Sequence, residues 1–189
     1  MSEKNITDLK TIRLSEDTNS VVILDQTRLP GKEVYLSLSS AEDLWEAIYK
    51  LKVRGAPAIG VAAAYGIYVC SKQIKAAGFD DFYKEFKRVK DYLASSRPTA
   101  VNLVAALNRM EKVVLDNCRE DVQALVRLLH KESQAIREED AAACRRIGEN
   151  CLSLLKPGMG LLTHCNAGHL AVSEYGTALA PVSYTHLTL

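Results

Sequence analysis

The sequence has 189 residues, a length typical of one large domain or of one and a half small ones. Apolar residues make up 48% of it and charged residues 25%, a globular balance that excludes the disordered and fibrous classes. The formal net charge is +1, and lysine and arginine are interleaved with acidic residues, so we expect no nucleic-acid partner.

We also expect no membrane span, no metal and no cofactor. The longest uncharged run, residues 55–71, contains Pro57 and is shorter than the roughly 20 residues of a membrane-spanning helix. The polar N-terminus lacks the apolar core of a signal peptide. The five cysteines form no CxxC pair, and no histidine stands at a metal-ligand spacing from them. This pattern argues against a disulfide framework or a zinc site and favours the cytoplasm.

The first elements predicted along the chain are strands. TIRL, SVVILD and EVYLSL, between residues 11 and 38, are β-branched or alternating runs, and RLPGK before the last of them has the Pro-Gly signal of a turn. We therefore expect a small antiparallel meander. From Ser39 the period becomes helical, with a capping-box spacing and with Leu44, Trp45, Ile48 and Leu51 on one face.

Four further helices are predicted, at about 58–75, 80–94, 98–117 and 120–155. After them, KPGMGLLTHCNAGHLA has the pattern of a turn, a short apolar strand, a small-residue turn and the start of another helix, which is how a parallel α/β layer begins. A lone parallel strand is not stable, so we expect a truncated second domain. The predicted division is an N-terminal meander and helical domain at 1–155, the start of the second domain at 156–181, and a tail of doubtful origin at 182–189.

The stretch VRGAPAIG places Arg54 directly before Gly55, Ala56 and Pro57. Proline suits the first position of a helix, and the free N–H groups that follow Arg54 would form an anion site at the positive end of the helix dipole. The arginine would add a bidentate clamp suited to phosphate. The motif alone leaves open a second interpretation, in which the small residues serve only helix packing and Arg54 is solvated.

The stretch SSRPTAVNL repeats this layout with Arg97, Pro98 and Thr99. Two arginines that each precede a proline-started helix could converge on one anionic ligand. The alternative is coincidence, because Ser-Arg-Pro-Thr is also an ordinary start of a helix.

Cys165 is the third candidate, where the predicted strand gives way to a helix at the ligand-binding edge of an α/β sheet. A thiol at a helix N-terminus has a lowered pKa and can serve as acid, base or nucleophile. The neighbouring His164 is a poor dyad partner, because adjacent residues of a strand point to opposite faces. The other four cysteines are interpreted as small buried hydrophobes, and His130 and His169 as surface or packing residues.

The sequence contains three motifs in the order VRGAPAIGVAAAYG, SSRPTAVNLVAALNRM and GLLTHCNAGHLAVSEYGTALAP. Together they resemble the motifs of methylthioribose-1-phosphate isomerases. That family also includes the regulatory subunits of the translation-initiation guanine-nucleotide exchange factor. The resemblance runs from about residue 10 to Pro181 and implies an α/β fold whose second domain is Rossmann-like. It also implies conversion of an aldose 1-phosphate into a ketose 1-phosphate in methionine salvage.

By the same resemblance, Arg54, Gly55 and Ala56 match a substrate-binding Arg-Gly-Ala, Arg97 a second phosphate-side arginine, and Cys165 the catalytic cysteine. The family's second domain supplies an aspartate, a glutamine and an Asn-Lys pair that this sequence lacks. We therefore expect a fragment with little or no turnover, and a homodimer for the full-length protein.

Three other functions stay open. The substrate could be ribose 1,5-bisphosphate or 5-deoxyribose 1-phosphate rather than 5-methylthioribose 1-phosphate. The chain could instead be a non-catalytic regulatory subunit, although a thiol kept together with Arg54 and Arg97 favours an enzyme. The last alternative is a helical domain whose glycines serve packing alone.

Overall fold

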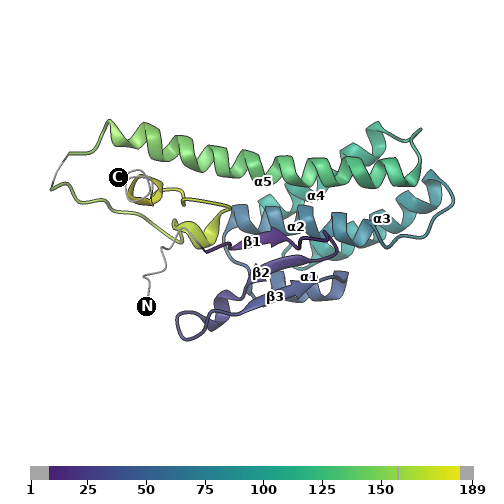
Figure 1. Cartoon of the computed structure of the whole chain (residues 1–189), viewed down its shortest axis with the longest axis horizontal. Helices are drawn as coiled ribbons and strands as arrows, with labels where there is room; N and C mark the ends of the chain where they lie inside the picture. The colour runs from purple at the N-terminus through teal and green to yellow at the C-terminus, as the bar shows by residue number, and fades with distance from the viewer. Residues whose placement is uncertain (1–8, 157, 184–189) are drawn as a thin grey trace.

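The computed structural model describes residues 9–156 and 158–183 (Figure 1). The strands are β1 (Ile12–Leu14), β2 (Val21–Leu24) and β3 (Tyr35–Leu38); the helices are α1 (Ala41–Tyr49), α2 (Ala56–Ser71), α3 (Phe79–Ser95), α4 (Val101–Asp116) and α5 (Val122–Leu152), with short 3-10 helices η2 (Gln26–Arg28) and η3 (His169–Ala171). The predicted meander and all five predicted helices are confirmed, with bounds that differ by a few residues.

The three strands form one antiparallel sheet in the order β1-β2-β3. Ile12 pairs with Ile23, and Val21 pairs with Leu38. The central strand β2 is buried along its whole length because it has a neighbour on both sides and helix α2 packs against the sheet. Helix α1 follows the sheet directly and is capped by Ser40, whose Oγ accepts a hydrogen bond from Asp43 N at 3.1 Å.

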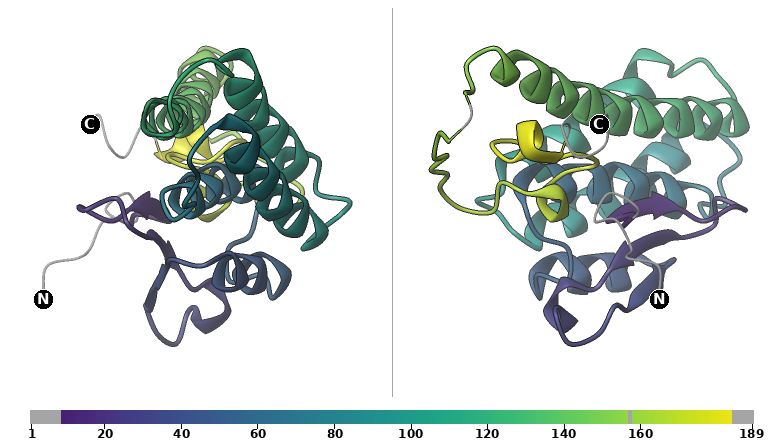
Figure 2. Two further views of the ribbon diagram at one scale, coloured as in Figure 1. Left: turned by 90° about the vertical axis from the view of Figure 1, so that its right-hand side faces the viewer. Right: turned by 60° about the vertical axis from the view of Figure 1, so that its left-hand side comes forward.

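Helix α2 is the centre of the molecule and lies between α5 and the sheet (Figures 1 and 2). It is apolar on all sides, so it has no face for water and is buried from Ala58 to Ser71. Two glycines allow close approach of other helices. A Cβ on Gly66 would lie 2.9 Å from Leu44 Cδ1 of α1, and one on Gly60 would lie 3.1 Å from the carbonyl oxygen of Asn102 in α4. Packing is therefore one real role of these small residues.

Helix α5 is 31 residues long and covers α2 and α4. It starts at Asp121, whose carboxylate accepts a hydrogen bond from Ala124 N at 2.7 Å. Arg109 of α4 donates hydrogen bonds to two α5 carboxylates, Glu132 and Glu139. Among the described residues, no helix combines the length and the apolar character that a membrane span requires.

The chain after α5 differs from the prediction. Over the described residues of 156–168 no strand forms, and the helix expected next is replaced by the three residues of η3. The physical reason is that a parallel strand needs hydrogen-bonded neighbours, and the three-stranded sheet supplies none here. A last helical turn covers 180–183, whereas residues 184–189 of the doubtful tail lie outside the described residues. The domain division at residue 155 stays a prediction.

Candidate functional site

The loop that carries Arg54 is held by the end of α1. The carbonyl oxygen of Ala47 accepts hydrogen bonds from Lys52 N at 2.9 Å and from Val53 N at 3.4 Å. Leu51 has a φ of +57°, so the chain turns back sharply after α1. Arg54 follows directly and leads into the N-terminus of α2.

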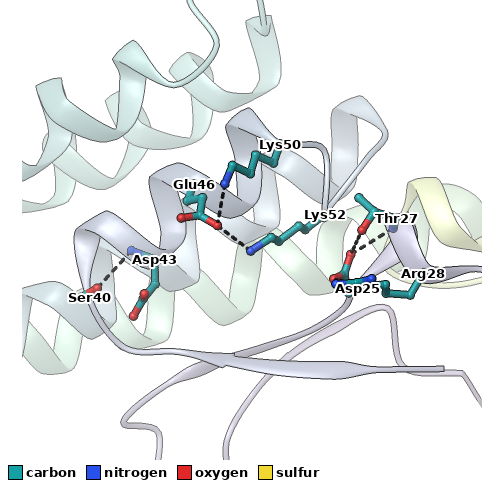
Figure 3. Close-up of polar contacts among 8 residues, drawn as sticks. All are labelled: Asp25, Thr27, Arg28, Ser40, Asp43, Glu46, Lys50 and Lys52. Carbon is teal, nitrogen blue, oxygen red and sulfur yellow. Dashed lines mark hydrogen bonds and ion pairs between the residues drawn. The ribbon is translucent and has the colours of Figure 1, made fainter. Parts of the chain in front are cut away.

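Arg54 differs from the two lysines that precede it. Glu46 pairs with Lys52 at 2.8 Å and with Lys50 at 3.3 Å (Figure 3), and the hydrogen bonds from these lysines lower the pKa of its carboxyl group. By contrast, the exposed guanidinium of Arg54 has no hydrogen bond or ion pair within residues 9–156 and 158–183. It is therefore available to an external anion.

Gly55 is the N-cap of α2 and has a φ of +92°. A Cβ at this position would lie 2.4 Å from Cα and 2.5 Å from the carbonyl oxygen of Ala171, so only glycine fits. Its neighbour Ala56 is exposed at the first helical position, where backbone N–H groups have no partner within the helix. The start of α2 thus lies directly against the segment that carries Cys165.

The second arginine lies in a different local structure from the one predicted. The carbonyl oxygen of Arg97 accepts a hydrogen bond from Ala100 N at 2.9 Å, so Pro98 and Thr99 form a turn. Helix α4 begins only at Val101, three residues later than expected. Proline is favoured at the second position of a turn as well as at the start of a helix, and here the turn forms. Arg97 itself is half-buried, and no partner for its guanidinium is found in the described chain.

The two arginine loops precede helix ends that touch each other. Gly60 in the second turn of α2 packs against Asn102 in the first turn of α4. Each arginine lies a few residues before its helix, so both loops are at this end of the helix pair. Convergence of the two guanidinium groups on one ligand stays a prediction.

Cys165 is exposed, with a φ of +65°, in a bend rather than at a strand–helix junction. The helix N-terminus expected to act on its thiol is not formed. All five cysteines are free, and Cys70 and Cys144 are buried as expected, with burial raising the pKa of each thiol to about 12. The expectation that Cys118 is buried was wrong, because it lies in the exposed turn between α4 and α5.

The segment after Cys165 is bound to the N-terminal part of the chain. His169 is buried, and its Nε2 forms a hydrogen bond with the carbonyl oxygen of Leu9 at 2.5 Å. Thr11 Oγ1 donates to the carbonyl oxygen of His169, and Gln26 Nε2 donates to that of Leu170 at 2.7 Å. His169 is therefore a packing residue, as predicted.

Helix α5 holds the same segment from the other side. Asp140 Oδ2 accepts a hydrogen bond from Ser173 N at 2.7 Å, and Arg137 forms an ion pair with Glu174. Both residues belong to a run of mixed charges that is typical of a solvated helix face, and of the two only Asp140 was a candidate from the sequence, for shaping a cleft. Their role is to fix the thiol-bearing segment beside Gly55.

A groove of about 400 Å³ opens beside the start of α2. It is lined by Pro57, Gly60, Val61, Asn102, Ala105, Ala106, Arg109, Ile136, Glu139 and Asp140. Arg109 in this groove is engaged by Glu139 and Glu132, and the hydrogen bond to Glu139 is the main cause that raises the pKa of Arg109. The groove is a poor phosphate site, because two carboxylates already neutralise the charge of Arg109 and because none of the predicted site residues lines the groove.

Comparison with known proteins decides the family. The profile of the Initiation factor 2 subunit family matches residues 52–183, most of the chain and both arginine loops. The chain belongs to this family. Within the family, the chain is 68% identical over 171 residues to a methylthioribose-1-phosphate isomerase of Parabacteroides distasonis, covering 90% of this chain and 51% of the relative. It is 54% identical over 175 residues to a 5-deoxyribose 1-phosphate isomerase of Petrotoga mobilis, covering 93% and 50%.

Two solved structures of the family have the same fold. The 5-methylthioribose 1-phosphate isomerase of Pyrococcus horikoshii matches with a TM-score of 0.88 and 34% identity, covering 98% of this chain and 53% of that one. The eIF-2B delta subunit of A. fulgidus matches with a TM-score of 0.83 and 38% identity, covering 95% and 52%. The predicted family resemblance is confirmed, and the chain spans about half the length of the relatives that it matches.

Proposed function

We propose that this chain is the N-terminal part of an aldose–ketose isomerase that converts 5-methylthioribose 1-phosphate into 5-methylthioribulose 1-phosphate in methionine salvage. The observation that carries the proposal is the contact between Gly55 and Ala171, which joins the Arg54 loop to the segment that bears Cys165. The 68% identity to a relative of that name supports the same assignment.

The residue types suit this chemistry. A phosphate on C1 keeps the sugar ring closed, so an acid must protonate the ring oxygen while hydrogen moves from C2 to C1. The guanidinium groups of Arg54 and Arg97, which have no partner among the described residues, would hold the phosphate together with the N–H groups of Gly55 and Ala56. The exposed thiol of Cys165 would take part in the proton steps.

Arg54, Arg97 and Cys165 would form only one half of the active site. Residues 156–183 would be the start of a Rossmann-like domain whose remainder supplies the other catalytic groups, so the 189-residue chain would bind phosphate without turnover. The complete protein would be a cytoplasmic homodimer without a nucleic-acid partner. Because the relative from Petrotoga mobilis is a 5-deoxyribose 1-phosphate isomerase, that sugar phosphate is the main alternative substrate. Ribose 1,5-bisphosphate is the third candidate substrate.

A regulatory, non-catalytic role is the second candidate, because the eIF-2B delta structure matches almost as well as the isomerase structure. The two candidates differ in their need for a phosphate site. An assembly subunit has no need of a phosphate site, whereas an isomerase would use both Arg54 and Arg97, whose guanidinium groups have no partner in the described part of the chain.

The test is a calorimetric titration of the chain with inorganic phosphate at constant ionic strength. Arg54→Ala and Arg97→Ala should each weaken binding at least about tenfold, the effect of losing one charge-assisted contact. Arg119→Ala is the matched control, because Arg119 is also exposed but lies beyond the opposite end of α4. Wild-type affinity in both loop variants would refute the phosphate assignment and leave the regulatory role.

A further inference from the structure

Three aromatic rings connect α1 with the end of α3 on the outside of the bundle. Trp45 stacks on Tyr49 with ring centroids 4.7 Å apart and on Tyr92 with centroids 6.0 Å apart. Tyr49 is 59% exposed and Tyr92 is 37% exposed, whereas Trp45 between them packs against the hydrophobic core. Trp45 is half-buried and is the ring that touches both others.

A hydrogen bond fixes the orientation of the Trp45 ring in this stack. Trp45 Nε1 donates to Ser95 Oγ at 3.0 Å, and the same hydroxyl donates to the carbonyl oxygen of Tyr92 at 2.6 Å. Ser95 is the last residue of α3 and stands two positions before Arg97. The indole is therefore tied to the start of the Arg97 loop.

The backbone of α1 is tied to the other arginine loop. Two residues after Trp45, the carbonyl oxygen of Ala47 accepts from Lys52 N and Val53 N, and Arg54 follows them. Helix α1 is thus a short rigid link that carries the Arg54 loop at its end and reaches the Arg97 loop through one side chain. The packing of Gly60 against Asn102 joins the starts of α2 and α4, and the hydrogen bond between Trp45 and Ser95 adds a second link between the two loops.

We propose that Trp45 is a positioning residue that sets the separation of Arg54 and Arg97 through its hydrogen bond to Ser95. This inference rests on the proposed function, because the separation matters only if both guanidinium groups hold one phosphate. Binding of a bidentate ligand by two groups is sensitive to displacements of about 1 Å, so loosening the link weakens binding without removing a contact to the ligand.

The experiment measures inorganic phosphate affinity and urea stability of the 189-residue chain for Trp45→Phe, Ser95→Ala and the double variant. Phenylalanine keeps a ring in the stack and removes the N–H. Each single variant should weaken phosphate binding about fivefold, the worth of one neutral hydrogen bond, and the double variant should weaken it no further. Ser95→Thr, which keeps the hydroxyl, should restore the affinity.

Trp45 also provides a direct spectroscopic readout, because it is the only tryptophan in the sequence. Its emission should change when phosphate binds to the wild-type chain, and this change should be reduced in Ser95→Ala. The control is Tyr65→Phe, which deletes the 2.7 Å hydrogen bond from Tyr65 to Gln134 between α2 and α5. This variant should lose stability but keep the phosphate affinity.

The outcomes separate the two proposals. Phosphate binding by the wild type with unchanged affinity in Trp45→Phe and Ser95→Ala would overturn the positioning role and leave the phosphate site standing. An equal loss of affinity in Tyr65→Phe would also overturn it, because the effect would then follow general stability. If the wild-type chain binds no phosphate, the phosphate site fails and the positioning role fails with it.

Discussion

Replacement of Gly55 by alanine should damage the stability of the chain and the position of the thiol-bearing segment together. At a φ of +92° a side chain is strained, which costs about 1–3 kcal/mol. The new Cβ would also lie 2.4 Å from Ala171 Cα, so η3 must move, and such overpacking costs about 1–3 kcal/mol more. We therefore expect the free energy of unfolding to fall by about 2–6 kcal/mol.

Urea unfolding followed by the emission of Trp45 measures this loss, and hydrogen exchange measures the segment separately. Amides at 167–175 should exchange faster in Gly55→Ala than in the wild type, because the contact that holds η3 against α2 is lost. Gly160→Ala is the control, since a Cβ there meets nothing within 4 Å and φ is not positive. A change below about 0.5 kcal/mol in Gly55→Ala, like that of a neutral surface substitution, would refute the close contact.

Two further predictions concern thiols and pH. Iodoacetamide should modify the exposed Cys118 and Cys165 within minutes and leave Cys70 unmodified until the chain unfolds. Mass spectrometry of digested samples measures the labelling of each cysteine. Early labelling of Cys70 would contradict its burial. Glu111→Gln should lower the free energy of unfolding at pH 7 by about 1–3 kcal/mol, because a neutral amide leaves the buried ammonium of Lys90 without the negative charge that lies 2.5 Å away in the wild type. Burial raises the pKa of Glu111, but hydrogen bonds, chiefly from Lys90, outweigh it and lower the pKa below 4.5. The wild type should therefore be more stable than Glu111→Gln by the full amount at pH values above the unfolded-state pKa of Glu111. This difference in stability should disappear as the pH falls through the folded-state pKa, and a difference that persists at pH 2 would contradict the prediction.

Local patterns predicted the helices and the meander well, because each is specified by its own periodicity. The β-branched apolar run in 20–25 predicted β2, and the uncharged run at 55–71 predicted a helix, which is buried on all sides. The start of α4 was misplaced because Pro98 suits both a turn and a helix, and only the Ala100 N–H to Arg97 carbonyl bond distinguishes them.

The region around Cys165 could not be predicted in the same way. Its position depends on contacts with residues that are far away in the sequence, such as Leu9 and Gln26, and no local pattern encodes them. The expected strand failed because a strand is specified by neighbours as much as by its own residues. Local patterns and the family resemblance both pointed to Arg54, Arg97 and Cys165 as candidates, but the contact that joins the Arg54 loop to the Cys165 segment through Gly55 was seen only in the structure.

The hydrogen bonds from His169 to Leu9 and from Gln26 to Leu170 bridge 160 and 144 positions of the chain. Contacts of such long range close large loops and are made late in folding, after local helices have formed. During synthesis, the sheet and the bundle can therefore assemble before the thiol has left the ribosome. Residues 165–171 would then pack onto a sheet and a helical bundle that have already formed.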